Sequence, residues 1–493
     1  MPFDVDYHAV APELILAGTA LLVLALDLFL RRERKWWAMP VSFLGTAGAL
    51  VATLTLIGER RTSFGGTYVV DSFAILFKVF FLVVALAVFM ISLRYFQHGR
   101  YYQGEYYFLV LSSFLGMLTI VSSRDLLMLF ISLELVTAPG FLIAGFRKGD
   151  PKSNEAALKF FLIGILSTAV MLYGMSLIYG ITGSLRLDTI ASVLSGSVRG
   201  PLVAVQRLSV SEPLAIAAVL FVVVGFAFKV SSVPFHFWAP DTYEGSPIPV
   251  AAFLSVASKA AGFAGLLQIM FVAFGPLAEF WTPVFAVLSV LTMSIGNLVA
   301  LQQRQVVRLL AYSSIAQAGY MLLPFALVGT SAAGDREAFS AAVLYILIYG
   351  TMNIGAFSVV IALSRDKPGV LIEDFAGLGQ RAAALAVPMA VFLVSLAGIP
   401  PTAGFWGKFF IFRAAINADQ AWLAIVMVIN SVISLYYYVS IVKQMFFVQL
   451  PEPRPLRAPV LVTGVVVLAM AAVVAVGILP DLFAQFPPDA TLP

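Results

Sequence analysis

The sequence contains no cysteine among its 493 residues. Thiolate-bound iron–sulfur clusters, zinc–thiolate sites, disulfides and catalytic thiols all require cysteine, so this chain can hold none of them. Its three histidines, His8, His98 and His236, are too scattered to predict paired haem ligation or a zinc motif. No GxGxxG or GxxxxGKS/T sequence occurs, so nucleotide binding has no support.

Charge is also scarce, because only 11% of the residues are Asp, Glu, Lys or Arg, whereas 61% are hydrophobic. Soluble domains carry about 25% charged residues. This chain therefore cannot cover a water-facing surface, which excludes a soluble enzyme, a secreted scaffold and a disordered protein. Long apolar runs without alternation exclude a β-barrel and predict an all-α polytopic membrane protein. The net charge of +4 is small and does not indicate nucleic-acid binding.

Apolar stretches of about 20 residues predict membrane-spanning helices, because a hydrocarbon core about 30 Å thick needs that length of helix. The connections between them are short except at 181–213, which is rich in Ser, Gly and Arg. The acidic residues before the first stretch lack the basic region of a cleaved signal peptide, so this stretch is expected to be retained. The sequence predicts about fourteen spans, at 11–30, 37–57, 72–93, 105–121, 125–146, 157–180, 214–238, 250–274, 281–302, 307–328, 338–363, 386–412, 421–446 and 457–480.

The distribution of Lys and Arg over alternate loops predicts the orientation. One set of loops holds 18 basic residues and the opposite set holds 8. The richer set is expected to be cytoplasmic, which places both termini outside and supports an even number of spans. The richer set comprises Arg31, Arg32, Arg34, Lys35, Arg94, Arg100, Arg147, Lys148, Lys152, Lys159, Arg304, Arg308, Arg365, Lys367, Arg381, Lys443, Arg454 and Arg457; the poorer set comprises Arg60, Arg61, Arg124, Arg186, Arg199, Arg207, Arg336 and Arg413.

The remaining four basic residues, Lys78, Lys229, Lys259 and Lys408, fall inside apolar runs. Glu134 is the one acid near the middle of a predicted span. An ionised side chain at mid-bilayer costs about 2.5–3.5 kcal/mol on the insertion scale. Burial disfavours the charged form of such groups, and an opposite charge nearby favours it, so a buried Lys–Glu pair can gain and lose protons. These residues therefore predict a proton relay.

Each of these residues also has a purely structural interpretation. Lys78 lies about two turns inside its span, so we expect its long side chain to extend outward to the interface. Lys229 could form a static ion pair between helices, and Lys408 follows a double proline where the backbone could be irregular. His236 could be a satisfied core or interfacial histidine.

Prolines interrupt two of the predicted spans, at Pro234 and at Pro400–Pro401. Proline removes a backbone donor and frees carbonyl groups that must be satisfied inside the protein. Breaks at corresponding positions of two halves are typical of transport sites at mid-membrane. The two broken spans are five apart, which predicts two five-helix repeats of opposite topology, spans 4–8 and 9–13. The expected units are an N-terminal three-helix segment at 1–104, repeats at 105–274 and 281–446, and a C-terminal helix and tail at 447–493.

Several segments resemble the antiporter-like membrane subunits of respiratory complex I and the related Mrp cation/proton antiporters. The resemblance touches spans 5 to 12, and the two segments that contain the prolines are long and specific. The segments are RDLLMLFISLELVTAPGF, EAALKFFLIG, KVSSVPFHFWAPDTYEGSPIPV, LLAYSSIAQAGY and LAGIPPTAGFWGKFFIF.

The resemblance implies an inverted-repeat fold with discontinuous helices 7 and 12, and it implies roles in proton translocation. Glu134 matches the fifth-span glutamate of the family, Lys229 the seventh-span lysine, Lys259 the bridging eighth-span lysine and Lys408 the twelfth-span charge. His236 falls where the family has a histidine in the broken-helix motif. The chain departs from the family just before LLAYSS, where relatives often carry Lys-Arg and this sequence has Val-Arg.

Lysine at position 408 and the absence of a long C-terminal lateral helix resemble the N-type subunit of bacterial NADH–quinone oxidoreductase. Mrp-type and membrane-bound hydrogenase subunits are close relatives. This resemblance implies a multi-pass protein of the bacterial cytoplasmic membrane, with NADH, FMN, iron–sulfur clusters and quinone bound in partner subunits. The expected partners are other antiporter-like and small membrane subunits, a peripheral redox arm, the lipid bilayer and protons.

The hypothesis for the mechanism is a switchable ion pair between Glu134 and Lys229. When the pair separates, the Lys229 proton passes through Lys259 and water towards Lys408 and leaves near the second helix break. Two alternatives of other classes stay open: a free-standing cation/proton transporter, which would move ions alone, and a structural membrane subunit, in which the buried lysines could become apolar without loss of activity.

Overall fold

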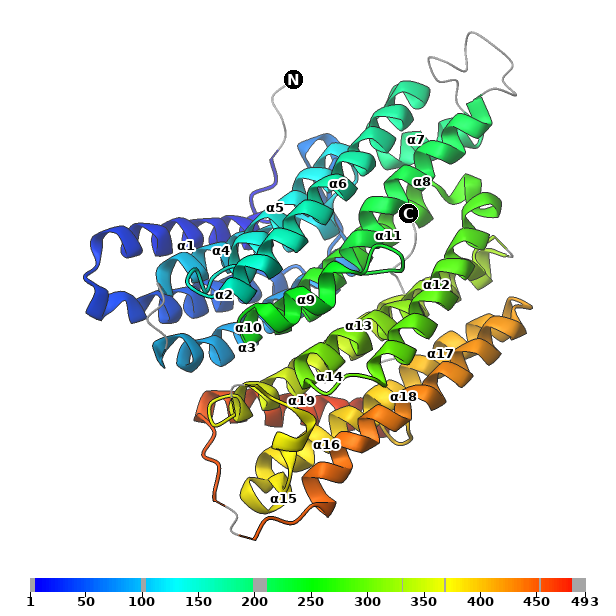
Figure 1. Cartoon of the computed structure of the whole chain (residues 1–493). Helices are drawn as coiled ribbons and strands as arrows, with labels where there is room; N and C mark the ends of the chain where they lie inside the picture. Colours follow the sequence, from blue (N-terminus) through cyan, green and yellow to red (C-terminus); the bar gives the residue numbers. More distant parts are fainter. Residues whose placement is uncertain are drawn as a thin grey trace.

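The computed structural model describes residues 5–98, 103–197, 211–329, 331–367, 369–451 and 454–480, and they form long helices packed side by side (Figure 1). The first half contains α1 (Ala11–Phe29), α2 (Ala38–Leu54), α3 (Ser72–His98), α4 (Gln103–Ser122), α5 (Leu126–Ala144), α6 (Pro151–Thr182), α7 (Leu187–Leu194), α8 (Ser211–Lys229), α9 (Trp238–Gly245), α10 (Ile248–Phe253) and α11 (Lys259–Gln268). The second half contains α12 (Ala278–Ala300), α13 (Val306–Leu322), α14 (Ala332–Leu363), α15 (Leu378–Arg381), α16 (Ala383–Ala397), α17 (Ala403–Asn417), α18 (Ala421–Phe447) and α19 (Val460–Ile478).

Shorter elements connect these helices. Two π-helical turns, η3 (Leu254–Ser258) and η4 (Ile269–Ala273), flank α11. A two-stranded antiparallel hairpin links α2 to α3 and pairs β1 (Arg61–Ser63) with β2 (Tyr68–Val70). The 3-10 turns are η1 (Arg32–Trp37), η2 (Phe64–Gly66), η5 (Gly275–Leu277), η6 (Leu323–Leu327) and η7 (Ile372–Phe375).

The prediction of an all-α membrane protein is confirmed. Within the described residues, 12 helical segments are long and apolar enough to cross a membrane. The other two predicted spans, 214–238 and 386–412, are the ones with internal prolines, and each contains a shorter apolar helix followed by a break and a second helix. The Arg100, Arg199 and Arg207 used to predict the orientation lie outside the described residues, as does part of the 181–213 connection.

Two spans begin earlier than their predicted starts because polar caps extend them. The Asp150 side chain accepts a hydrogen bond from the Lys152 backbone amide (3.0 Å), and Pro151 occupies the first turn of α6. Ser331 accepts one from the Gly334 amide (3.0 Å) and starts α14. Such side chains satisfy amides that the first turn of a helix leaves free, so helices start at them rather than at the first apolar residue.

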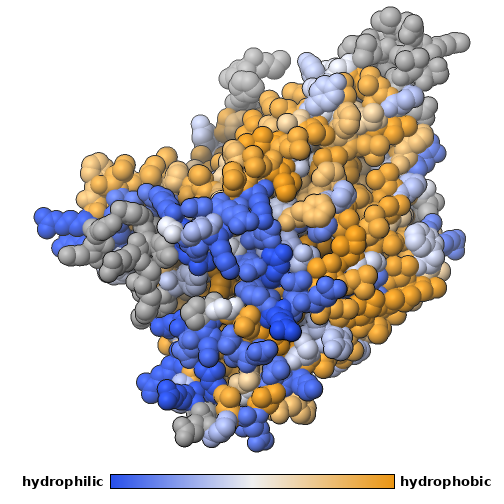
Figure 2. Space-filling model, in the orientation of Figure 1, coloured by the Kyte–Doolittle hydropathy of each residue, from blue (hydrophilic) through white to orange (hydrophobic). Residues whose placement is uncertain are grey.

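The centre of the molecule is built from the segment 248–273 together with α13 and α14 (Figure 1). Every residue in the apolar window of 248–273 is buried, as are 89% of those in α13 and α14, against 33% in α1, α2 and α18. Figure 2 shows apolar residues over a broad part of one face and hydrophilic residues gathered in one region of it. Charged side chains on the central helices are therefore surrounded by protein rather than by lipid.

The N-terminal segment and the hairpin form a cap over the starts of α1 and α3. Asp6 pairs with Arg61 of β1 at 2.8 Å, and the hydrogen bond from the Arg61 guanidinium lowers the pKa of Asp6. The Tyr68 hydroxyl donates to the Ala9 carbonyl (3.2 Å). Ala9 and Tyr68 are buried in a small apolar cluster between the cap and the helices.

Beneath this cap, the expectation that Lys78 extends to the interface is wrong. Its side chain is 0% exposed, and its Nζ lies 2.8 Å from Oε1 of Glu13 on α1 and donates to the Tyr68 hydroxyl at 2.7 Å. The cap blocks the route outward, and Glu13 offers an opposite charge inside the protein. Glu13 drew no attention in the sequence because it lies in the first turn of its span.

Candidate functional site

The first helix break lies where Pro234 predicts it. Helix α8 ends at Lys229, and α9 begins at Trp238 after an irregular segment. The Trp238 indole donates to the Phe228 carbonyl (3.2 Å), and the Val233 amide donates to Thr292 Oγ1 (3.0 Å). Side chains therefore satisfy backbone groups that the break releases, as a break inside a membrane requires.

Lys229 is buried at the end of α8, and its Nζ donates a hydrogen bond to Thr137 Oγ1 on α5 at 2.7 Å. Gly262 on α11 makes room for the Lys229 side chain, because a Cβ at Gly262 would lie 2.8 Å from Lys229 Cγ. The absence of a side chain at Gly262 thus lets the Lys229 stem lie against the helix that carries Lys259. This contact brings the lysines of the seventh and eighth predicted spans onto neighbouring helices.

Glu134 lies one helical turn before Thr137 on α5. Within the described part of the chain it forms no direct ion pair, and its buried Oε1 has no hydrogen-bond partner. The structure therefore places Lys229 on the same stretch of α5 as Glu134 but bonded to the neutral Thr137. Thr137 was missed from the sequence because a threonine inside a helix commonly bonds its own backbone, as this one also does to the Leu133 carbonyl (2.6 Å).

Lys259 follows directly after the π-helical turn η3. Such turns are frequent at functional sites. Its buried Nζ donates to the Ser314 carbonyl (2.9 Å) and to Ser314 Oγ (2.5 Å) on α13. Both partners of the ammonium group are neutral.

The second break also lies at its predicted prolines, since α16 ends at Ala397 and α17 begins at Ala403. Lys408 reaches back across the break, and its Nζ lies 3.1 Å from both the Leu396 and the Ala397 carbonyl oxygens. The ammonium group thus caps the C-terminal end of α16, where free carbonyls carry partial negative charge. Gly404 lets the start of α17 pack closely against the end of α16, because a Cβ at Gly404 would lie 1.8 Å from the Ser395 carbonyl oxygen.

Polar side chains on α13 and α14 lie between Lys259 and Lys408. On the Lys259 side, Tyr349 donates to Ser314 Oγ (2.8 Å), and Asn353 Nδ2 donates to the Tyr349 hydroxyl (2.8 Å). On the Lys408 side, Gln317 Nε2 donates to the Leu396 carbonyl oxygen (3.0 Å) that Lys408 also contacts.

We call the side chains of Ser314, Gln317, Tyr349 and Asn353 the polar bridge, and further polar contacts surround Lys408. Its Nζ lies 4.5 Å from the centroid of the Tyr320 ring, and Tyr345 donates a hydrogen bond to Gln317 Oε1. The bridge was missed from the sequence, although Ser and Gln inside the apolar span 307–328 were a signal that could have found it. The spacing of Ser314 and Gln317, three residues apart, puts both on one face of a helix.

His236 lies in the first break and is buried, with its ring 4.5 Å from that of Phe237. Its Nδ1 has no hydrogen-bond partner in the described part of the chain. Within the described residues no hydrogen bond joins His236 to the three buried lysines. The structure therefore places Lys229 and Lys259 on neighbouring helices, α8 and α11. Lys408 lies on α17, which packs against α14, and His236 lies in the first break.

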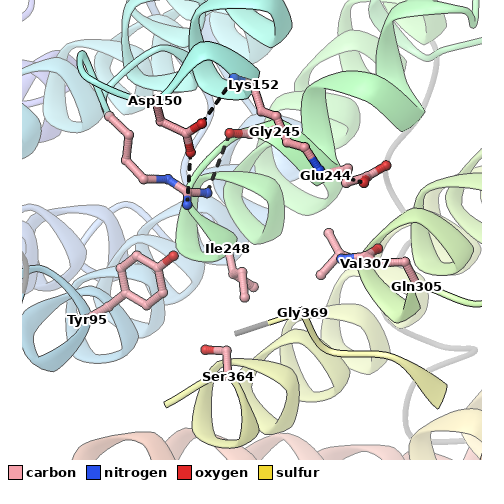
Figure 3. Close-up of a pocket in the computed structure, with 11 residues that line it drawn as sticks. Tyr95, Asp150, Lys152, Glu244, Gly245, Ile248, Gln305, Val307, Ser364 and Gly369 are labelled. Atoms are coloured by element: carbon pink, nitrogen blue, oxygen red, sulfur yellow. Dashed lines mark hydrogen bonds and ion pairs between the residues drawn. The ribbon is translucent and has the colours of Figure 1, made fainter. Parts of the chain in front are cut away.

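A polar cavity of about 240 Å³ opens at one end of the helices, between α9 and the starts of α6 and α13 (Figure 3). Glu244 of α9 and Lys152 of α6 line it, with 3.9 Å between the Lys152 ammonium and a Glu244 carboxylate oxygen. Arg308 contacts Glu244 at 3.0 Å and Asp241 at 2.7 Å, which ties α9 to α13. Val307, at the position where the sequence departs from the family, also lines this cavity.

The buried groups of the site are amines, one carboxyl, hydroxyls and amides. Among the described residues, no group of three or more His, Asp or Glu side chains could hold a metal ion. Amines and carboxyls exchange protons, and hydroxyls and amides pass or orient them. The arrangement is therefore suited to moving protons.

Comparisons with known proteins identify the family to which this architecture belongs. Residues 123–434 match the family model described as NADH:quinone oxidoreductase/Mrp antiporter, TM. NADH-quinone oxidoreductase subunit N of Trichlorobacter lovleyi is 39% identical over 490 residues, which cover 99% of this chain and 97% of that protein. The chain belongs to this family.

The N type predicted from the sequence is confirmed at the level of the family. F(420)H(2) dehydrogenase subunit N of Methanosarcina mazei is 37% identical and covers 98% of both chains. Among solved structures, respiratory complex I from Thermus thermophilus contains a chain that is 32% identical, with a TM-score of 0.78, coverage of 97% of this chain and 98% of that chain. A chain of respiratory complex I thus shares this fold over nearly its whole length.

Proposed function

We propose that this chain is the proton-translocating subunit N of the membrane arm of a redox-driven NADH–quinone oxidoreductase, and that protons move through Glu134, Lys229, Lys259 and Lys408. The observation that carries the proposal is that three buried lysines, in or beside the central helices, have only neutral hydrogen-bond partners. Burying such groups is costly, and membrane proteins retain them where ions or protons pass.

In this proposal, Thr137 is the resting partner of Lys229, and Glu134 is the acid that holds the Lys229 charge when the two approach. When Glu134 is drawn away, burial favours release of the Lys229 proton towards Lys259. Two ammonium groups on adjacent helices repel strongly where water is scarce, so protonation of Lys259 drives the next transfer towards Lys408. Ser314 and the other polar groups of α13 and α14 bridge that gap.

The polar cavity between α6, α9 and α13 is the proposed entrance. Tyr243 follows it inward, one residue before Glu244 on α9, and among the described residues its buried hydroxyl has no hydrogen-bond partner. A water molecule between this hydroxyl and the Tyr349–Asn353 pair would extend the route to Lys259. His236 and Pro234 belong to the break beside this route, and the exit lies near the break at Pro400 and Pro401.

The redox chemistry belongs to partner subunits in this proposal, which would bind NADH, FMN, iron–sulfur clusters and quinone. The relatives named for NADH-quinone oxidoreductase and for F(420)H(2) dehydrogenase support a shared membrane subunit that serves more than one electron donor. We place the chain in a bacterial cytoplasmic membrane, with both termini outside, from the excess of basic residues in one set of loops. The two five-helix repeats at 105–274 and 281–446 are part of the same proposal.

The test replaces Lys229 by alanine and Glu134 by glutamine in the assembled complex. Both variants should lose proton pumping in reconstituted vesicles while the complex still assembles. Lys148→Ala is the matched control, since Lys148 lies in the loop between α5 and α6 and its side chain is 76% exposed. Undiminished pumping in both variants would refute the relay.

Two further results would separate the alternatives. Cation/proton exchange by the purified chain alone would indicate a free-standing or Mrp-type antiporter. Full activity after Lys229, Lys259 and Lys408 are all made apolar would indicate a structural subunit.

A further inference from the structure

Lys408, at the second helix break, has three partners in the described part of the chain. Its Nζ lies 3.1 Å from both the Leu396 and the Ala397 carbonyl oxygens, and 4.5 Å from the centroid of the Tyr320 ring. An ammonium group carries three N–H donors. The two carbonyls accept two of them, so the face of the Tyr320 ring is the partner that remains for the third.

The surroundings of this contact favour a strong attraction. The face of an aromatic ring attracts a cation electrostatically, and the attraction grows where water is excluded. Tyr320 is 0% exposed and Lys408 is 6% exposed. Within the described residues, no carboxylate lies within ion-pair distance of the Lys408 ammonium group. The ring is therefore placed to attract a buried charge that has no counter-ion in this part of the chain.

The Tyr320 ring is held from its hydroxyl end. Asn297 of α12 donates from Nδ2 to the Tyr320 hydroxyl (3.1 Å) and to the Asn430 backbone carbonyl of α18 (3.1 Å). The Tyr437 hydroxyl, also on α18, donates to Asn297 Oδ1 (2.9 Å). Asn297, Asn430 and Tyr437 are all buried. Because both ends of the Asn297 amide are bonded, the Tyr320 hydroxyl is fixed and the ring is held over Lys408.

Tyr320 also extends the series of polar contacts along α13. Ser314 contacts Lys259. Tyr320, six residues later, faces Lys408, and Gln317 of the polar bridge lies midway between Ser314 and Tyr320. Residues three apart are neighbours on the surface of a helix. One side of α13 therefore contacts both lysines.

We propose that Tyr320 is a positioning residue of the proton relay: its ring holds the Lys408 ammonium group at the second break through a cation–π interaction, and Asn297 keeps the ring in place. This inference rests on the proposed role of Lys408 in proton transfer. Unlike a carboxylate, the ring cannot take the proton from the lysine. A neutral amine is not attracted in the same way, so the ring distinguishes the two protonation states of Lys408 and leaves the transfer itself to the polar bridge.

The test changes the electron density of the ring and nearly keeps its size. Tyr320 is replaced in the assembled complex by phenylalanine and by mono-, di- and trifluorophenylalanine, and proton pumping and electron transfer are measured in reconstituted vesicles. Fluorine withdraws electron density from the ring face and so weakens its attraction for a cation. We expect Tyr320→Phe to retain most of the pumping rate. The rate should then fall with each added fluorine, to about a tenth with three, which is also the level expected for Tyr320→Leu.

Phe392 of α16 provides the matched control. It is a buried ring close to the same break, and it packs against Gly355 of α14, where a Cβ would lie 2.3 Å from the end of the ring. Within the described residues no cation lies over it. The same fluorinated residues in place of Phe392 should leave pumping unchanged.

Three results would overturn the inference. Equal pumping by the phenylalanine and trifluorophenylalanine variants, where Lys408→Ala does not pump, would show that the Tyr320 ring only fills space, and it would leave the proposed function intact. An equal decline in the Phe392 series would assign the effect to fluorine in the protein core. Normal pumping by Lys408→Ala would remove Lys408 from the relay and the role of Tyr320 with it, which identifies a failure of the proposed function.

Discussion

Replacing Ser314 by alanine tests the proposed bridge most directly. The Ser314 hydroxyl contacts both the Lys259 ammonium, at 2.5 Å, and the Tyr349 hydroxyl, at 2.8 Å. Alanine removes this connection and leaves Lys259 its second bond, to the Ser314 carbonyl at 2.9 Å. The substitution therefore separates Lys259 from α14 without leaving a buried ammonium group unpaired.

The size of the effect follows from the bond that is lost. A hydrogen bond to a charged group contributes about 1.5–3 kcal/mol. Because the carbonyl bond remains, we take the lower end of that range, which corresponds to a roughly tenfold slower proton transfer through Lys259. Stability should also fall, because the buried Tyr349 hydroxyl loses its acceptor at a cost of about 1–3 kcal/mol, so assembly of the variant is measured together with its pumping.

The assay measures proton uptake into vesicles and electron transfer in the same preparation of the assembled complex. Ser314→Ala should lower the pumping rate about tenfold, whereas Ser314→Thr, which keeps a hydroxyl, should retain most of it. Ser358→Ala is the matched control, because within the described residues the buried Ser358 of α14 bonds only the Ile354 carbonyl of its own helix (2.7 Å). Wild-type pumping by Ser314→Ala, with normal assembly, would refute the bridge.

Three other predictions concern Lys229, the Glu13–Lys78 pair and the cap. Gly262→Val should displace the Lys229 side chain at a cost of about 1–3 kcal/mol and impair pumping, and normal pumping would show that the contact is unimportant. Glu13→Gln leaves Lys78 buried without a counter-charge, a loss of up to about 3–5 kcal/mol, so the midpoint of thermal unfolding in detergent should fall and partly recover in Glu13→Gln/Lys78→Met. Because the pKa of Asp6 is lowered in the folded cap, the ion pair between Asp6 and Arg61 stabilises the cap at neutral pH. This contribution is lost as the pH falls below about 3.9, the ordinary pKa of an aspartate. Hydrogen exchange of the cap amides should then be faster than at neutral pH, and equal protection at neutral and low pH would contradict this.

The spans could be predicted from the sequence because membrane insertion depends on local composition. A helix in lipid needs about 20 apolar residues whatever its neighbours are. Each predicted range therefore overlaps a helix, and the range 386–412 overlaps both α16 and α17, whereas 214–238 covers most of α8 and ends where α9 begins. Pro234 and Pro400–Pro401 marked the breaks for a similarly local reason, since a proline removes a backbone donor from its own helix.

The partners of the buried charges could not be predicted from local composition. Lys78 was expected at the interface, but Glu13, 65 positions earlier in the chain, holds it inside at 2.8 Å. Lys229 donates to Thr137, which lies one turn along the same helix from Glu134, and nothing in the sequence indicated this partner. Which residues meet between two helices depends on how each helix is rotated about its axis and how deep it lies in the membrane. A run of apolar residues specifies neither.

By itself, the sequence determined that this protein is a multi-span helical membrane protein, where two of its spans break, and which few residues carry charge in the apolar layer. Only the tertiary structure decided what those charges touch: neutral hydroxyls and carbonyls for three lysines, a glutamate for the fourth, and Ser314 and Gln317 between Lys259 and Lys408. The physical reason is that the free energy of placing a residue in a membrane is set mostly by its own side chain, whereas the role of a buried charge is set by atoms within a few ångströms that come from distant parts of the chain.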